Sequence, residues 1–267
     1  MRVGVTGATG FIGQHVVEFL KVNTEWELEK ITPDNIVGYF DVLVNLAATT
    51  NPVQAMVDPA EALRNNGLII YDLFGANFGR LIHVSTAEVY GALVRGMATI
   101  TSPLNPDNPY AIAKAAQEHL IGFYAAQTGK LTTILNIMNV FGKYQPENKL
   151  FKVALKNIQD GEAMHGDPFM TRQFVHADEV ANAIMALCTV YELEPKYHLA
   201  GGQELTIAQF VNKIADVVGK PYPMWKGFDE LRPGHSGRYA MSSHLPINYV
   251  VRKTLDQYIE QTVNELT

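Results

Sequence analysis

Short hydrophobic runs alternate with longer amphipathic stretches along the first half of the chain. Continuous apolar and β-branched runs predict buried strands at residues 3–6, 41–47, 80–85 and 131–140. Apolar residues at helical spacing predict helices at residues 11–21, 59–74 and 109–128. Strands that are apolar on both faces and separated by helices are typical of βαβ units. We therefore predict an α/β protein with a Rossmann-like, doubly wound parallel sheet.

The second half has a different character. Prolines and glycines become frequent after about residue 140, and basic residues stand isolated in predicted loops. Thr206 precedes an amphipathic stretch, which predicts a capped helix over residues 207–218. A last helix is predicted over about residues 249–265.

These patterns suggest two lobes. We predict that residues 1–142 form a dinucleotide-binding lobe and that residues 172–200 return to it. Residues 143–171 and 201–267 would form most of a smaller C-terminal substrate lobe.

Composition and charge exclude several classes of protein. The 267 residues are 47% hydrophobic, and 21 Lys and Arg face 27 Asp and Glu, for a net charge of −6. Such a chain has no long-range attraction to nucleic acids or anionic membranes, so an anionic ligand needs local cations. No run approaches the roughly 18 apolar residues of a membrane span, and no signal peptide is evident. We expect a cytoplasmic protein with no nucleic-acid partner and no membrane partner.

A metal centre and a disulfide framework are also disfavoured. The single cysteine excludes paired thiols and a thiolate zinc site, and the histidines lack H-E-x-x-H spacing. We predict no bound metal.

Three glycines lie between the first strand and the first helix. Gly7, Gly10 and Gly13 form a G-x-x-G-x-x-G turn. Such a turn lets the backbone approach a pyrophosphate at a helix N-terminus. The spacing departs from G-x-G-x-x-G, and the P-loop lysine is absent. The position of the turn predicts a dinucleotide site.

The residue that would bind the adenosine ribose is harder to place. Glu29 and Lys30 are the candidates at the end of the second strand, and about ten residues separate them from the next strand. One strand or its connecting helix is therefore missing or short. We predict NAD as the coenzyme, and NADP is not excluded.

A tyrosine and a lysine stand one helical turn apart. Tyr110 and Lys114 share a helix face, and a nearby ammonium would lower the pKa of the tyrosine so that it acts as a base. Thr86 at the end of a strand would lie beside them. The same spacing recurs at Tyr222 and Lys226, where an intervening proline argues against a helix.

Several motifs in a fixed order resemble those of the extended short-chain dehydrogenase/reductase family. They are TGATGFIG, NLAA, STAEVYG, YAIAK, NVFG, RQFVHADEVANAI and RPGHSGRYA. The likeness is to the NAD-dependent nucleotide-sugar epimerase/dehydratase branch, and most of all to dTDP-glucose 4,6-dehydratases. The chain is shorter than typical members, which implies a trimmed substrate lobe.

The resemblance implies a set of site residues and a nucleotide-diphosphate sugar as substrate. The implied catalytic residues are Thr86, Tyr110, Lys114 and Glu88. The implied coenzyme contacts are Gly7, Thr9, Gly10, Phe11, Ile12, Gly13, Leu46, Ala47, Ala48, Asn65 (which Asn66 adjoins), Ser85, Tyr110 and Lys114. The implied substrate contacts are Thr86, Asn139, Lys149, Arg172, Arg232 and His235.

One departure leaves the reaction open. The dehydratases carry Thr-Asp-Glu where this chain has Thr86, Ala87 and Glu88, so the acid that protonates the leaving C6 hydroxyl is absent. Glu88 remains as a base for the C5 proton. The alternatives are a 4-epimerase, which needs neither acid, a 4-keto-sugar reductase, or a non-catalytic NAD-binding protein. The family also implies a homodimer formed through the helices at 59–74 and 109–128.

Overall fold

The computed structural model describes every residue except 33, 49–51 and 228–236. Its larger lobe is built on a six-stranded sheet in the order β2-β1-β3-β4-β5-β9, in which all neighbouring strands are parallel. The strands are β1 (Arg2–Thr6), β2 (Glu27–Ile31), β3 (Tyr39–Asn45), β4 (Asn77–Thr86), β5 (Leu131–Ile137) and β9 (Lys196–Leu199).

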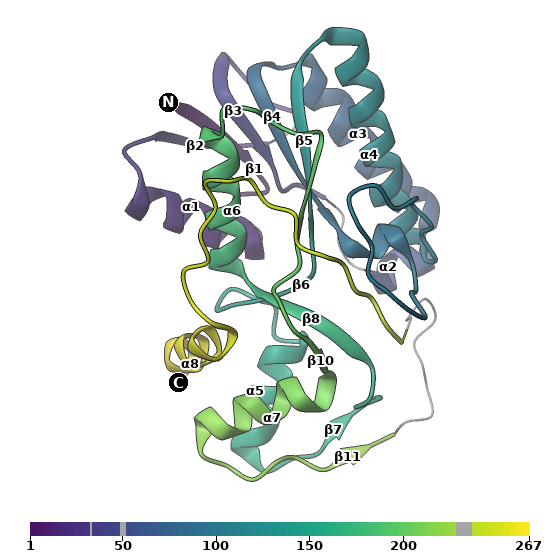
Figure 1. Ribbon diagram of the computed structural model, residues 1–267, viewed down its shortest axis with the longest axis vertical. Helices are drawn as coiled ribbons and strands as arrows, with labels where there is room; N and C mark the ends of the chain where they lie inside the picture. The colour runs from purple at the N-terminus through teal and green to yellow at the C-terminus, as the bar shows by residue number, and fades with distance from the viewer. Residues whose placement is uncertain (33, 49–51, 228–236) are drawn as a thin grey trace.

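Helices cover both faces of this sheet (Figure 1). One face carries α1 (Phe11–Asn23) and α6 (Ala177–Thr189), which pack on each other. The other carries α3 (Pro59–Gly75) and α4 (Pro109–Thr128), with the short α2 (Pro52–Val57) beside them. Each face has its own apolar core, because the strands are apolar on both sides. The predicted Rossmann-like α/β fold is confirmed.

The strand order reverses at β1. From β1 the chain goes first to β2 on one side and then to β3 on the other. In open α/β sheets, ligands bind in the crevice that such a reversal creates at the carboxyl ends of the strands. That crevice here lies between the ends of β1 and β3.

The connection from β2 to β3 is short. The described residues between Ile31 and Tyr39 include no helix, only an isolated bridge between Thr32 and Asn35. β2 is therefore present as the edge strand, and the missing element is the helix that would follow it.

A smaller sheet with the order β10-β8-β6 lies below the larger lobe (Figure 1). Its strands are β6 (Asn139–Phe141), β8 (Thr171–His176) and β10 (Glu204–Thr206). The remaining elements of this part are α5 (Leu150–Asp160), α7 (Ile207–Val218), α8 (Leu255–Leu266), β7 (Met164–His165) and β11 (Trp225–Lys226). They enclose a third apolar core that includes Phe141, Phe151 and Phe210.

The apolar run at residues 131–140 is two strands, not one. β5 ends at Ile137 in the large sheet, and β6 begins at Asn139 in the small one. Hydropathy is the same on both sides of Met138, so the pattern hides the change of partner. Residues 172–200 are likewise divided, since β8 lies in the small sheet while α6 and β9 belong to the large lobe.

The last helix begins later than residue 249. Thr254 caps α8 and shares a reciprocal capping box with Gln257. Upstream, Tyr249 donates a hydrogen bond to Glu179, and the backbone N–H of Arg252 donates a second one to the same carboxylate. These bonds hold the segment against α6 in a non-helical path.

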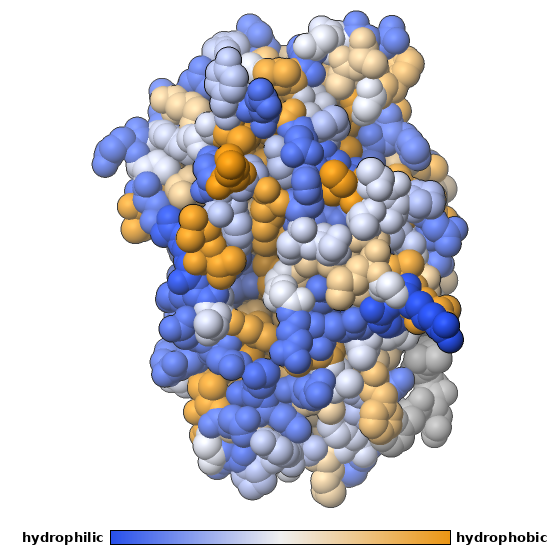
Figure 2. Space-filling model, viewed as in Figure 1, coloured by the Kyte–Doolittle hydropathy of each residue, from blue (hydrophilic) through white to orange (hydrophobic). Residues whose placement is uncertain are grey.

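On the face drawn in Figure 2, hydrophobic residues form small separate patches among hydrophilic ones. Among the helices of the described residues, none is long and apolar enough to cross a membrane.

Candidate active site

The glycine turn is packed too closely to accept side chains. Gly7 has φ of 66°, and a Cβ on it would stand 2.7 Å from Ala47 N. A Cβ on Gly13 would stand 2.1 Å from Gly7 O. Gly10 is the N-cap of α1 and has no side chain that could accept from the first-turn N–H groups. This bare turn at the sheet crevice fits the pyrophosphate of a dinucleotide.

The other predicted coenzyme residues surround this turn. Leu46, Ala47 and Ala48 follow β3 and are half-buried, and Phe11 and Ile12 open α1. Thr9 is exposed.

Two adjacent asparagines in α3 have different surroundings. Asn66 is fully buried. Its side-chain Nδ2 donates to Ala62 O (2.8 Å), and its backbone carbonyl accepts from Gln117 Nε2 of α4 (2.9 Å). Asn65 is half-buried. Asn66 is therefore committed to packing α3 on α4.

At the end of β2 the candidate acid is engaged elsewhere. Glu29 Oε2 accepts from Arg2 at 2.6 Å. Lys30 is exposed, and the strand ends on the buried Ile31. Neither candidate therefore offers a carboxylate to a ribose at the strand end: Glu29 is paired with Arg2, and Lys30 has no carboxyl group.

The start of α4 brings the predicted catalytic residues together. Asn108 is the N-cap: its Oδ1 accepts from Ala111 N (2.9 Å), while its Nδ2 donates to Glu88 Oε2 (3.1 Å). Tyr110 in the first turn is hydrogen-bonded to the Thr86 side chain at the end of β4. The cap thus fixes the tyrosine beside the threonine and the glutamate.

The ionisation of Tyr110 differs from the expectation. Burial and the negative charge of Glu88 raise the pKa of Tyr110, and the hydrogen bond with Thr86 opposes them in part. The lowering by Lys114 that we predicted is absent, because burial leaves the lysine amine uncharged well below the pH at which Tyr110 ionises.

Lys114 is buried beneath the end of β4. Its Nζ donates to Val84 O at 3.0 Å and lies 3.2 Å from His83 Nε2. Burial lowers the pKa of Lys114 to about 7, against the opposing charge of Glu118 one turn later. The amine is therefore near its titration midpoint at neutral pH.

Glu88 lies among both signs of charge. Burial raises its pKa, whereas the Asn108 hydrogen bond and the charges of Arg172 and Lys149 lower it. Arg172 is buried, stacks over the Tyr239 ring at 4.7 Å and donates to Thr171 O at 2.7 Å. The two cations are thus close enough to act on the candidate base.

The remaining substrate candidates lie in or near the small lobe. Asn139 opens β6 and is half-buried. Lys149 is exposed at the N-cap of α5. Arg232 and His235 lie outside the described residues.

Ser85 has a structural partner. Its hydroxyl donates to Glu118 Oε1 at 2.6 Å, and Glu118 also accepts from Lys196 at 2.7 Å. These bonds join β4, α4 and β9 next to the predicted catalytic residues.

Three residues near the site escaped the sequence reasoning. Asn108 could have been found, because Asn followed by Pro is a typical helix start. Tyr239 and His83 gave no such signal, since their positions beside Arg172 and Lys114 depend on tertiary contacts.

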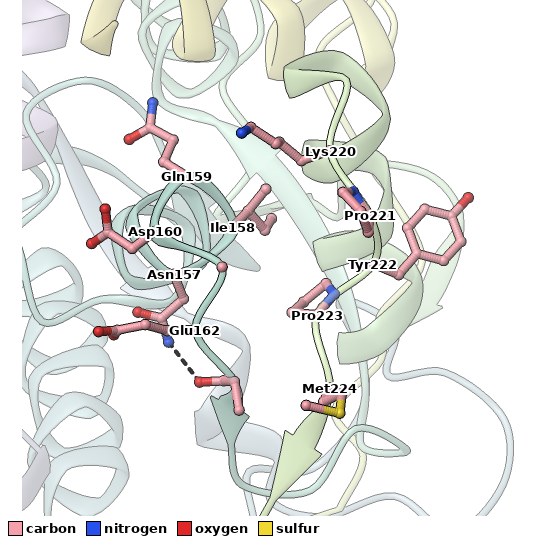
Figure 3. Close-up of a pocket in the computed structure, with 12 residues that line it drawn as sticks. Asn157, Ile158, Gln159, Asp160, Glu162, Lys220, Pro221, Tyr222, Pro223 and Met224 are labelled. Atoms are coloured by element: carbon pink, nitrogen blue, oxygen red, sulfur yellow. Dashed lines mark hydrogen bonds between the residues drawn. The ribbon is translucent and has the colours of Figure 1, made fainter.

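The second tyrosine–lysine spacing forms no comparable site. Tyr222 is 58% exposed, and Lys226 belongs to β11 rather than to a helix. Tyr222 borders a pocket of about 420 Å³ between the end of α5 and residues 220–224, from which its ring points away (Figure 3). This pocket contains none of the predicted site residues. No group of three or more potential metal ligands lies together among the described residues.

Comparisons with known proteins identify the family. Residues 3–200 match the model of the NAD dependent epimerase/dehydratase family. A dTDP-glucose 4,6-dehydratase from Streptomyces niveus is 30% identical over 216 residues, which cover 79% of this chain and 64% of that protein. A second one, from Streptomyces antibioticus, is 27% identical and covers 90% of this chain and 84% of its own length.

Solved structures share the fold. The dTDP-glucose 4,6-dehydratase DesIV from Streptomyces venezuelae, with NAD bound, superposes with a TM-score of 0.85 at 25% identity, covering 99% of this chain and 96% of that one. A UDP-glucuronic acid 4-epimerase from Bacillus cereus reaches 0.87 at 20% identity with full coverage of both chains. The predicted family and its coenzyme, NAD, are confirmed. The chain belongs to the NAD-dependent epimerase/dehydratase family of enzymes.

Proposed function

We propose that this enzyme acts on a nucleotide-diphosphate sugar and that its reaction begins with oxidation at C4. The observation that carries the proposal is the meeting of Tyr110, Thr86 and Glu88 at the carboxyl end of β4. A phenol bonded to a hydroxyl, with a carboxyl group beside it, can remove a proton from a sugar hydroxyl and then one from the adjacent carbon. The names of the relatives support this substrate class.

The chain's own residues divide the first step between them. Tyr110 as phenolate takes the proton of the C4 hydroxyl, and Thr86 orients the same oxygen. A positive charge on Lys114, one helical turn away, favours the phenolate. Bound NAD+ would supply the acceptor for the hydride from C4, held at the pyrophosphate by Gly7, Gly10 and Gly13.

The proposed diphosphate contacts are Arg172 and Lys149. Both lie near Glu88, so the sugar would extend from these cations toward Tyr110. Asn139, Arg232 and His235 remain predicted substrate contacts. The cytoplasmic location also stays a prediction.

Dehydration is the outcome we propose: Glu88 removes the C5 proton that a 4-ketone acidifies and passes it to the C6 hydroxyl, which leaves as water, and the reduced coenzyme would supply the hydride to C6. Burial raises the pKa of Glu88, which makes the carboxylate a stronger base for this proton. A specific observation favours 4-epimerisation as the second candidate. Ala87 is buried and apolar where the dehydratases carry their acid.

Product analysis tests the proposal. The enzyme with NAD is incubated with a panel of nucleotide sugars, and the masses of the products are measured by mass spectrometry. Loss of water indicates dehydration, and an unchanged mass with altered chromatography indicates epimerisation. Stoichiometric consumption of a reduced coenzyme would indicate a reductase, and no turnover of any sugar would contradict the proposal.

Replacement of Glu88 separates the two outcomes. We expect Glu88→Gln to lower dehydration by at least about 10²-fold and to abolish uptake of solvent deuterium at C5. In the wild type, the rate should rise with pH through a midpoint above the usual carboxyl range, because the base form appears only above the raised pKa. Glu192→Gln, at an exposed position, is the control. Unchanged deuterium uptake in Glu88→Gln would remove Glu88 from this role.

We also propose a homodimer in which α3 and α4 pack against the same helices of a second copy. Large apolar side chains on these helices are open to solvent in the single chain, among them Tyr71 (66% exposed) and Phe123 (58%). Ile112 precedes Phe123 by three turns on α4 and is also exposed. Such a row buries apolar area in a self-complementary contact.

A charge on this surface should dissociate the dimer. We expect Phe123→Glu to elute at the mass of a single chain in size exclusion with light scattering. Val22→Glu, on the exposed end of α1, should leave the dimer intact. A monomeric wild type would exclude the dimer.

A further inference from the structure

A row of polar side chains crosses the large sheet beneath the crevice. Thr6, Asn45 and His83 occupy matching register positions on β1, β3 and β4. Thr6 Oγ1 lies 2.5 Å from Asn45 Oδ1, and Asn45 Nδ2 lies 2.8 Å from His83 Nδ1. The other ring nitrogen, Nε2, lies 3.2 Å from Lys114 Nζ. The row therefore connects the strand that ends at the glycine turn with the proposed catalytic lysine.

This row lies where apolar residues would be expected. Thr6, Asn45 and His83 are each 0% exposed, in a sheet whose neighbouring positions are valine, leucine and isoleucine. Buried polar groups cost stability unless every one of them is paired. Burial, and then the charge of Lys114, hold the pKa of His83 well below its usual range, so the ring is neutral at pH 7.

The donors and acceptors available to His83 link the tautomer of its ring to the charge on Lys114. A neutral imidazole has one N–H, and an ammonium can only donate. When Lys114 is charged, His83 Nε2 must accept, so the ring proton sits on Nδ1 and Asn45 must present its amide oxygen to it. When Lys114 is neutral, Asn45 donates to Nδ1 and His83 Nε2–H faces the amine. The structure places Asn45 Nδ2 beside His83 Nδ1, so the arrangement with a charged Lys114 requires the side-chain amide of Asn45 to turn over.

Among the groups around the Lys114 amine, His83 is the side chain placed to accept a hydrogen bond from it. On α4, Tyr110 precedes Lys114 by one turn, and Glu118 follows it by one turn. Glu118 is already paired with Lys196 of β9. Glu88 in the short 3-10 helix at 87–90 acts on Tyr110 rather than on the lysine. From β4, the groups that meet Nζ are Val84 O and His83.

We propose that His83, held by Asn45, is a positioning residue for Lys114: its Nε2 accepts a hydrogen bond from the ammonium and so keeps the proton on the residue that supports the Tyr110 phenolate. The catalytic part of this inference rests on the proposed function. The hydrogen-bond part concerns the free protein and is measured separately.

The titration of Lys114 tests the hydrogen bond directly. The coenzyme-free protein is labelled with ¹³C at the lysine ε-carbons, and the Lys114 signal is assigned by its absence in Lys114→Met. We expect a midpoint near pH 7 in the wild type. In His83→Leu the midpoint should fall by about one pH unit or more, because a hydrogen bond to a charged group is lost. His83→Gln keeps an acceptor and should stay close to the wild type.

A second variant serves if His83→Leu does not fold. Asn45→Asp offers only acceptors, which fixes the ring proton on Nδ1 and leaves Nε2 to accept from Lys114. Its midpoint should therefore rise. An unmoved Lys114 midpoint in folded His83→Leu, or in Asn45→Asp, would overturn the proposal.

The pH profile of kcat tests whether His83 affects catalysis through Lys114. The alkaline limb should move with the Lys114 midpoint in each variant, since the ammonium is the form that supports the phenolate. A uniform loss of activity at every pH, with an unmoved limb, would reduce His83 to a structural residue. Absence of turnover in the wild type would contradict the proposed function and leave the NMR result standing.

Discussion

Replacing Tyr110 with phenylalanine should lower kcat by at least about 10²-fold while leaving NAD affinity nearly unchanged. The substitution removes the phenol oxygen that is bonded to Thr86, and with it the group proposed to take the C4 hydroxyl proton. General-base catalysis contributes on this scale. The ring itself remains, so the first turn of α4 keeps its packing. Steady-state kinetics and calorimetric titration with NAD measure the two quantities.

The matched control is Tyr191→Phe, which removes a phenol oxygen from a side chain that is 96% exposed. It should be fully active. A fully active Tyr110→Phe enzyme would show that the proton is taken by another group, and the proposed mechanism would be wrong.

Gly13→Ala should weaken NAD binding by about 10-fold or more and lower the melting temperature. The added Cβ would stand 2.1 Å from Gly7 O and 2.7 Å from Ala8 Cα. Both atoms belong to the backbone, so the glycine turn itself must move. Overpacking of this kind costs about 1–3 kcal/mol, and 1.4 kcal/mol is a factor of ten in affinity. Calorimetric titration and thermal unfolding report the two effects.

Gly75→Ala provides the comparison, because a Cβ there meets no atom within 4 Å at the exposed end of α3. It should bind NAD as the wild type does. Equal affinities and melting temperatures for Gly13→Ala and wild type would mean that the turn tolerates a side chain and that the coenzyme does not depend on its close packing.

Local patterns carried much of the fold. The helix at residues 109–128 has the predicted bounds, since Asn108 and Pro109 start it and Gly129 ends it with a positive φ. The strand at 131–140 was wrong because one apolar run supplies β5 and β6 to different sheets. The helix predicted from residue 249 starts at Leu255, because Glu179 binds the preceding segment from another part of the chain.

The sequence by itself determined the main alternation of strands and helices in the larger lobe, the glycine turn, and the placement of Tyr110 and Lys114 one turn apart, because these depend on neighbours within a few residues. Only the tertiary structure decided where the lysine amine points. Its partners come from β4, and His83 is in turn held by Asn45 of β3, more than thirty residues away in the chain. Burial in that row lowers the pKa of Lys114 toward neutrality, and burial raises that of Tyr110. Desolvation depends on the whole packed lobe, so no local pattern of residues encodes it.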